Sequence, residues 1–251
     1  MVSKTIVIRD GVSEIGVETA LIYSKNKNNI VFLLDSESNL KKNNKIILDK
    51  VEGRIKFINR DNYNNSEINA LKKISDINQR IDVLINDTRI YMPKNNKIEN
   101  EEEKINNYQK KIKDNIKVSK FVLPLMVNNK YGAIINVSSI FGIKAWPKFD
   151  FFYNTNNFLN QLTEQFAVEY GKYNIRINCI CVGPTNDFIS KNLNLFGKDL
   201  EKVKNELISM HPLGRLVEPY EIAKAIEFLV SDKASFINGV ILRIDGGFSV
   251  K

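Results

Sequence analysis

Residues 132–157 read GAIINVSSIFGIKAWPKFDFFYNTNN, and this stretch holds the clearest strand and helix signals of the chain. An apolar run over Ala133–Val137 ends in the pair Ser138–Ser139, which is typical of a buried strand that reaches the edge of a sheet. After a short loop, Tyr153 stands near the start of a helical pattern that runs to Tyr170. A buried strand followed by a long helix is the repeating unit of a parallel α/β sheet.

The same alternation continues on both sides of this stretch. The pattern predicts strands at residues 4–9, 30–35, 54–59, 81–86, 133–137, 175–181 and 240–244, and helices at 14–26, 38–50, 66–79, 151–170, 199–209 and 219–231, with two more helices within 99–128. No Pro-rich or Ser-rich linker divides the chain, and no internal repeat is visible. We therefore predict an α/β fold: one Rossmann-type domain over residues 1–251, with a doubly wound parallel sheet and helices on both faces.

An irregular piece at about residues 183–198 interrupts the alternation. Loops of this length are usually either disordered or lids over a site. This one comes directly after a predicted strand, and ligands bind at the carboxyl edge of such sheets. We therefore predict a substrate lid at about residues 183–210.

The composition argues against several classes of function. The net charge is +8, but the lysines are scattered among asparagines, so we expect them to be solvated and not to form a nucleic-acid surface. No apolar run is long enough to cross a membrane, and no signal-peptide region precedes the first strand. Cys179 and Cys181 lie two apart on a predicted strand, which favours buried free thiols over a disulfide or metal ligands. These features predict a cytoplasmic protein without a metal.

Residues 4–250 resemble the classical short-chain dehydrogenase/reductases. In that family a strand ends in Ser, a Tyr follows about thirteen residues later, and a Lys follows the Tyr by four. Ser139 and Tyr153 stand at nearly that spacing, and Asn157 stands at the Lys position. The segment HPLGRLVEPYEIAKAIEFLVSDKASFINGVILRIDGGFSV, at residues 211–250, is similar to the end of bacterial 3-oxoacyl-acyl-carrier-protein reductases, where it builds the last helix, the last strand and a subunit interface.

The resemblance implies an oxidoreductase that interconverts a carbonyl and a secondary alcohol with a nicotinamide cofactor. In the family the Ser orients the carbonyl, the Tyr is the general acid/base, and the Lys lowers the pKa of the Tyr and holds the ribose. These roles fall on Ser139, Tyr153 and the position of Asn157. The cofactor-binding positions fall on Gly11, Ile15, Gly16, Asp35, Asn59, Asn86 and Gly183.

Asp35 follows the second predicted strand, where a carboxylate can accept hydrogen bonds from an adenosine ribose. It would also repel a 2′-phosphate, so it favours NAD(H) over NADP(H). An ordinary solvated Asp after a strand is an equally good interpretation of this residue.

The cofactor motifs depart from the family pattern. The phosphate-binding turn T-G-x-x-x-G-x-G becomes RDGVSEIG at residues 9–16, so that Asp10 and Glu14 stand at two glycine positions. A carboxylate about 4 Å from a phosphate costs about 4 kcal/mol at an effective dielectric near 20, unless it turns away or meets a cation. The N-N-A-G segment becomes NDTR at residues 86–89, and Asp187 stands at the position of a nicotinamide-binding Thr. These changes predict weakened cofactor binding.

Two of the family's catalytic positions, an Asn and a Lys, carry each other's residue type in this chain. Aligned without gaps, Lys111 stands where the family carries an Asn of its proton relay, while Asn157 replaces the Lys. Our hypothesis is that the ammonium of Lys111 does part of the missing lysine's work on Tyr153, because a Tyr with a pKa near 10 needs nearby positive charge to act near neutrality. Coincidence in a lysine-rich chain is the simpler interpretation. Asn115 becomes the relay Asn if the alignment slips by one helical turn.

Two functions are compatible with these residues. The first is a nicotinamide-linked oxidoreductase acting on a small molecule or an acyl thioester, with a 3-oxoacyl thioester as the best substrate. The second is a non-catalytic homologue that serves as a structural or regulatory subunit, in which Asp10 and Glu14 pair with Arg89 and Lys111 across a vacated cofactor groove. Both predict a homo- or hetero-oligomer, a dimer or a tetramer, through the C-terminal region.

Overall fold

A parallel sheet forms the centre of the molecule. The computed structural model describes residues 3–43, 54–63, 66–87, 101–145, 150–191 and 199–251. Within these residues the sheet has seven strands in the order β3-β2-β1-β4-β5-β6-β7, and all neighbouring strands are parallel. The direction of strand addition reverses at β1, so the sheet is doubly wound, and the predicted Rossmann-type fold is confirmed.

The predicted strands and helices are found close to their expected bounds. The strands are β1 Thr5–Arg9, β2 Ile30–Asp35, β3 Ile55–Asn59, β4 Val83–Asp87, β5 Gly132–Ser139, β6 Ile175–Val182 and β7 Ile241–Ile244. The helices are α1 Glu14–Ser24, α2 Glu37–Asn43, α3 Glu67–Asn78, α4 Glu101–Asn129, α5 Asp150–Tyr170, α6 Asn186–Lys191, α8 Leu200–Met210 and α9 Pro219–Val230.

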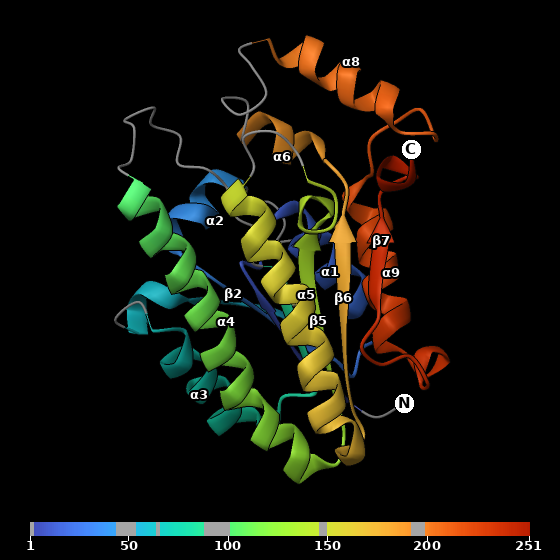
Figure 1. Cartoon of the computed structure of the whole chain (residues 1–251). Coiled ribbons are helices and arrows are strands. Elements are labelled where there is room, and N and C mark those ends of the chain that lie inside the picture. Colours follow the sequence, from blue (N-terminus) through green and yellow to red (C-terminus); the bar gives the residue numbers. More distant parts are fainter. Residues whose placement is uncertain (1–2, 44–53, 64–65, 88–100, 146–149, 192–198) are drawn as a thin grey trace.

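Helices cover both faces of the sheet (Figure 1). Side chains of a strand alternate between the two faces, so Ile6 and Ile8 of β1 join one core and Val7 joins the other. The first core includes apolar side chains of α1 and α9, and the second includes side chains of α3, α4 and α5. Because the strands are parallel, their carboxyl ends lie at one edge of the sheet, which is where a ligand would bind.

Three predicted elements differ from the structure or extend beyond the described residues. The two helices expected within residues 99–128 are one helix, α4, which continues past Pro124. The irregular piece after residue 183 contains the short helix α6. Of the helix predicted at 38–50, the structure describes α2 up to Asn43, and residues 44–53 lie outside the described part.

A third apolar cluster lies beyond the carboxyl ends of β5 and β6, where α6 and α8 are found in Figure 1. Its buried members come from the short helix η3 (Ile140–Gly142), α6, α8 and the C-terminal segment. Phe141 packs against Phe188 of α6 at 5.8 Å between ring centroids and against Phe248 at 6.1 Å. The region predicted as a lid is thus joined to the turn that follows Ser139.

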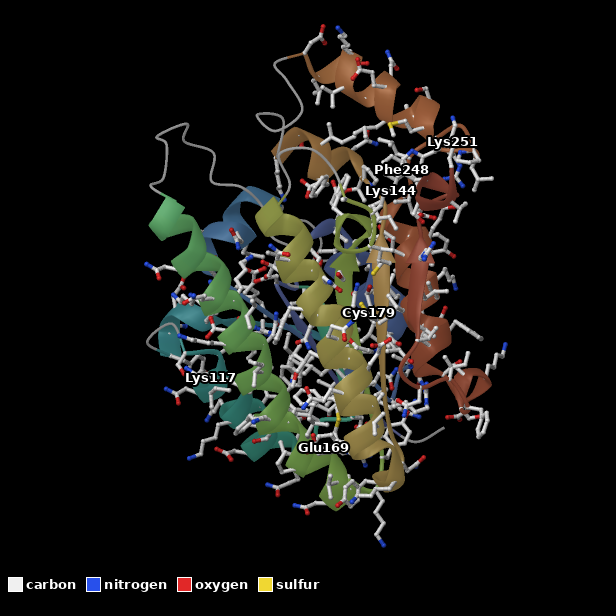
Figure 2. The ribbon with its side chains drawn as sticks, viewed as in Figure 1. Lys117, Lys144, Glu169, Cys179, Phe248 and Lys251 are labelled. Atoms are coloured by element: carbon white, nitrogen blue, oxygen red, sulfur yellow. The ribbon has the colours of Figure 1, made fainter. Side chains whose placement is uncertain are left out.

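Both cysteines are free and buried, as expected from their spacing. Figure 2 shows Cys179 about halfway along β6, and the thiols of Cys179 and Cys181 both contact Oδ1 of Asn160, at 3.3 and 3.4 Å. Among the described residues, no group of three or more His, Cys, Asp and Glu side chains is arranged to hold a metal ion. None of the helices in the described ranges is long and apolar enough to cross a membrane.

Candidate active site

Ser139 stands at the carboxyl end of β5, where the sequence predicted a catalytic Ser. Its side chain is buried, and its Oγ accepts a hydrogen bond of 3.3 Å from the backbone N–H of Phe141. This bond caps η3 and fixes the turn that leaves the strand. The backbone N–H of Ser139 donates to Oδ1 of Asn156 at 3.1 Å, so strand and helix are tied at this point.

The first turns of α5 carry the other predicted catalytic positions. Tyr153 lies in the first turn, and its side chain is outside the part that the structure describes. Asn157 lies one helical turn later and is half-buried. A Cβ atom on Gly142 would lie only 2.5 Å from Cβ of Asn156, so η3 approaches α5 in a way that only glycine allows. The backbone therefore brings Ser139 and the helix turn of Tyr153 to one place.

Asn156 is a site residue that sequence reasoning missed. It is almost fully buried, and its Oδ1 also accepts from Oγ of Ser138 at 3.3 Å. A polar residue on the sheet-facing side of a helix is the only signal that could have pointed to it. It is a positioning residue, because its side chain links the backbone of Ser139, at the end of β5, to α5.

The turn between β1 and α1 has its left-handed residue at Asp10, one of the two positions where the family carries glycine. Asp10 adopts a left-handed φ of 48°, which Asp tolerates better than most residues, so the turn is not shifted onto Gly11. A Cβ on Gly16 would lie 2.5 Å from the carbonyl oxygen of Gly11. A Cβ on Gly11 would lie 2.7 Å from the carbonyl oxygen of Ile8, so both glycines are required by close packing against backbone, whatever they bind.

Four backbone N–H groups of this turn already have acceptors inside the chain. Gly11 donates to the carbonyl of Leu34 at 3.3 Å, and Ser13 donates to that of Asp10 at 3.1 Å. Val12 donates to Oδ2 of Asp35 at 3.2 Å, and Gly16 donates to Oγ of Ser13 at 2.9 Å.

Ser13 is also bonded to a carboxylate from the next strand. Its Oγ donates a short hydrogen bond to Oδ2 of Asp87, the last residue of β4, while it caps the N-terminus of α1. The side chain of Asp87 is buried. A negative charge of the chain itself therefore lies at the positive end of α1, which is the end that attracts anions.

The carboxylate of Asp35 is turned inward, at the end of β2. It is 1% exposed and accepts hydrogen bonds from the backbone N–H groups of Val12 and Ser36 and from Nδ2 of Asn39. Burial raises the pKa of Asp35, although these three hydrogen bonds favour the ionised form. Asn59, the other predicted adenosine contact, is half-buried at the end of β3 and donates weakly to Glu37 at 3.4 Å.

Asn86 belongs to a buried polar network centred on Arg9. Nη1 of Arg9 donates to Oδ1 of Asn86 at 3.1 Å and to Oδ1 of Asn115 at 2.5 Å, and Nη2 forms an ion pair with Glu67. Asn86 in turn donates to Oδ1 of Asn136 at 2.7 Å. Arg9 therefore engages both Asn86 and Asn115 through their side-chain oxygens.

Lys111 faces the turn from α4. It is half-buried, and its positive charge acts on Asp10. Burial raises the pKa of Asp10 to about 6, and the charge of Lys111 opposes this rise, while Asp35 and Glu67 add to it. Of the two cations in the predicted pairing, Lys111 acts on the ionisation of Asp10 through its charge, and Arg89 lies outside the described residues.

The predicted lid borders a cavity of about 290 Å³. The cavity lies between Glu14 at the start of α1 and residues of α6 and α8, including Asp187 and Lys204. Asp187, at the position of a nicotinamide-binding Thr in the family, forms an ion pair with Lys191 at 2.7 Å. Gly183 precedes α6, and a Cβ there would lie 3.1 Å from Cα of Asp245, so it too is held by close packing.

The C-terminus closes over the turn that follows Ser139. Nζ of Lys144 donates to the carbonyls of Phe248 and Lys251, at 3.1 and 3.0 Å, and it lies 5.2 Å from the centre of the Phe248 ring. Figure 2 shows these three residues together beside α8. His211, at the end of α8, is buried 5.0 Å from the same ring, and its Nδ1 contacts the carbonyl of Leu207.

Comparisons with known proteins agree with this architecture. The chain matches the family model described as enoyl-(acyl carrier protein) reductase over residues 11–249. It is 28% identical over 250 residues to the 3-oxoacyl-[acyl-carrier-protein] reductase FabG of Chlamydia muridarum, across 99% of this chain and 98% of that protein. It is 33% identical over 132 residues to the inactive 2-(S)-hydroxypropyl-CoM dehydrogenase 2 of Xanthobacter autotrophicus, across 52% of this chain and 57% of that protein.

The fold is shared with a solved reductase. The crystal structure of YwfH, an NADPH-dependent reductase involved in bacilysin biosynthesis, superimposes with a TM-score of 0.84 at 23% identity, and the match covers 98% of both chains. The family model covers nearly the whole chain, and the Ser-bearing strand and Tyr-bearing helix lie side by side within it. The chain therefore belongs to the short-chain dehydrogenase/reductase family of oxidoreductases.

Proposed function

We propose that this chain interconverts a carbonyl and a secondary alcohol with a nicotinamide cofactor, and that its substrate is a 3-oxoacyl thioester. The observation that carries the proposal is the junction of β5 and α5. There the bond from Ser139 to Asn156 holds the Ser at the end of the strand against the helix that begins beside Tyr153. The similarity to a 3-oxoacyl-[acyl-carrier-protein] reductase over 99% of the chain supports the choice of substrate.

The residues of the chain have distinct tasks in this proposal. The hydroxyl of Ser139 donates a hydrogen bond to the carbonyl oxygen and orients it, and the hydroxyl of Tyr153 exchanges the proton. Lys111 supplies positive charge to the site, in place of the Lys that Asn157 replaces. A nicotinamide cofactor, when bound, supplies or accepts the hydride.

In the arrangement described here, the phosphate-binding turn is closed by hydrogen bonds within the chain, so a dinucleotide binds only if some of these contacts open. Four of its backbone N–H groups donate hydrogen bonds within the chain. Asp35 accepts one of these bonds directly, from Val12. Asp87 accepts from the hydroxyl of Ser13, which itself accepts from Gly16. We propose NAD(H) rather than NADP(H), because Asp35 adds negative charge where a 2′-phosphate would lie. We also propose that residues 183–210 act as a substrate lid, and that the chain assembles as a homo- or hetero-oligomer.

An assay of the wild type and matched variants tests the activity. We expect a purified preparation to oxidise NADH in the presence of acetoacetyl-CoA, and we expect Ser139→Ala and Tyr153→Phe each to lower kcat at least a hundredfold. Ser235→Ala and Tyr220→Phe remove the same groups from exposed positions and should leave the rate unchanged. A folded protein that oxidises neither NADH nor NADPH with oxoacyl thioesters or simple ketones would contradict the proposal.

The role of Lys111 has its own test. Lys111→Ala should lower kcat and raise the pH at which Tyr153 acts, because it removes the positive charge that favours the ionised Tyr. Asn157→Lys restores the family's residue and should recover activity in the Lys111→Ala background. If activity and its pH profile are the same in Lys111→Ala and in the wild type, Lys111 has no part in the chemistry.

The self-bonded turn favours a second candidate function, that of a non-catalytic subunit. The bond between Ser13 and Asp87 and the charge of Lys111 beside Asp10 keep the groove intact without a ligand. One of the relatives is itself named an inactive dehydrogenase. In this case NADH would not raise the Tm of the protein, and co-purification with an active family member from the source cells would identify the partner.

A further inference from the structure

We propose that Asp87 acts as an internal anion that occupies the phosphate end of the nucleotide site, so that a dinucleotide binds only by displacing it. The inference rests on the proposed use of a nicotinamide cofactor. It assigns to Asp87 the control of cofactor affinity.

The sheet register places Asp87 beside the phosphate-binding turn. Strands β1 and β4 are parallel neighbours, and Arg9 pairs with Asn86 across them. The next residues along the chain, Asp10 and Asp87, therefore lie side by side at the carboxyl edge, where Asp10 follows β1 and Asp87 ends β4. Asp10 begins the turn, whereas Asp87 belongs to the neighbouring strand. The carboxylate of Asp87 therefore reaches the turn because of the sheet pairing and not because it is near in sequence.

The contact made by Asp87 is the one that a phosphate oxygen would make. The N-terminus of α1 carries N–H groups that are not bonded within the helix, and it favours negative charge. Ser13 relays that polarity, because its Oγ accepts from the N–H of Gly16 and donates to Oδ2 of Asp87. The carboxylate is thus the terminal acceptor of a chain of hydrogen bonds that starts at the helix.

Burial strengthens this contact. Asp87 is 2% exposed, so its charge is screened little by solvent, and a phosphate at the same place would meet it at close range. Asp35 lies on the other side of the turn and accepts from the N–H of Val12. Asp35 and Asp87 stand at the ends of β2 and β4, the two strands that flank β1. Together they accept hydrogen bonds from the N–H of Val12 and the hydroxyl of Ser13, so these donors of the turn are satisfied without a ligand.

Calorimetric titration of NADH into wild type, Asp87→Asn and Asp76→Asn tests the proposal. Asp87→Asn keeps the shape and the hydrogen-bonding capacity of the side chain but removes the charge, so it should bind NADH at least tenfold more tightly than the wild type. Asp76→Asn makes the same change of net charge on an exposed turn of α3, and it should bind NADH as the wild type does. Adenosine has no phosphate and should bind all three proteins equally.

The outcomes separate this inference from the proposed function. If Asp87→Asn binds NADH no more tightly than the wild type, or if neither binds it, Asp87 does not occupy the phosphate site. If Asp87→Asn gains affinity for NADH but not for adenosine, while neither protein reduces an oxoacyl thioester, the inference stands and the proposed reaction fails. Should Asp87→Asn not fold, Asp87→Ser removes the charge with a smaller side chain and must show the same gain.

Discussion

The guanidinium of Arg9 forms a buried ion pair with the carboxylate of Glu67, which joins the end of β1 to the first turn of α3. The Arg9 side chain is 3% exposed and that of Glu67 is 14% exposed. Burial alone would raise the pKa of Glu67, but the charge and hydrogen bond of Arg9, with the charge of Arg60, hold that pKa below its usual value. The ion pair is part of a larger buried network, because Arg9 also donates hydrogen bonds to Asn86 and Asn115.

Removing Arg9 should strongly destabilise the fold. Arg9→Met keeps most of the side-chain volume, but it leaves Glu67 buried without its main cation and removes the hydrogen bonds that Arg9 donates to Asn86 and Asn115. We expect the free energy of unfolding to fall by about 3–5 kcal/mol, measured by urea denaturation.

The exposed pair of Arg215 and Glu221 provides the control. Nη2 of Arg215 lies 2.7 Å from Oε1 of Glu221, but the two side chains are 54% and 39% exposed. Arg215→Met should cost at most about 1 kcal/mol. A loss as large as that of Arg9→Met would show that burial is not what makes the first pair important.

The stability of the protein should depend on the ionisation of Asp10. Its pKa is raised to about 6 in the folded chain, so the folded state holds the proton more tightly than the unfolded state does. Stability from this group therefore decreases as the pH rises from about 4 to about 6. Asp10→Asn suits the left-handed backbone and removes the cost, so at pH 8 it should raise the free energy of unfolding by about 1–3 kcal/mol.

Two measurements define that prediction. The difference between Asp10→Asn and wild type should disappear below about pH 4, where the Asp is protonated in both states. Asp76→Asn, on an exposed turn, should stay within about 0.5 kcal/mol of wild type at every pH. A variant that is less stable than wild type at pH 8 would mean that Lys111 outweighs the cost of burying the charge.

The C-terminal contact with the region predicted as a lid should depend on Phe248. Its side chain is fully buried among Phe141, His211 and the apolar residues of α6 and α8. Phe248→Ala should lower the free energy of unfolding by about 3–5 kcal/mol. Phe236→Ala makes the same change at a fully exposed side chain and should have an effect within about 0.5 kcal/mol. Equal losses in the two variants would contradict the packing described here.

Gly16 should not tolerate a side chain. The Cβ of Gly16→Ala would lie 2.5 Å from the carbonyl oxygen of Gly11, and backbone has to move to make room. We expect a loss of about 1–3 kcal/mol or more in the free energy of unfolding. Gly171→Ala, where the nearest atom is a side-chain nitrogen of Asn238 at 3.1 Å, should cost less. Because the loss comes from packing, it should appear without any nucleotide present.

The sequence alone was enough to predict the order of the elements. Apolar runs such as Val31–Leu34, and helical spacing such as that of Leu71 and Ile74, are local patterns in the sequence. These residues are buried in the structure, so the patterns identified core positions correctly. The same reasoning divided α4 in two, and this was wrong. Val118, Val122 and Met126 pack on the sheet and keep one helix across Pro124, which a local pattern cannot reveal.

The sequence was enough to predict a doubly wound sheet, a Ser at the end of β5 and a Tyr at the start of α5, because these features follow from local periodicity and spacing. Only the tertiary structure decided which polar side chains meet at the carboxyl edge. The partners of Ser13 and Arg9 come from strands and helices far along the chain, at Asp87, Glu67 and Asn115. The register of parallel strands brings them together, and burial then requires each charge and hydrogen-bonding group to find a partner.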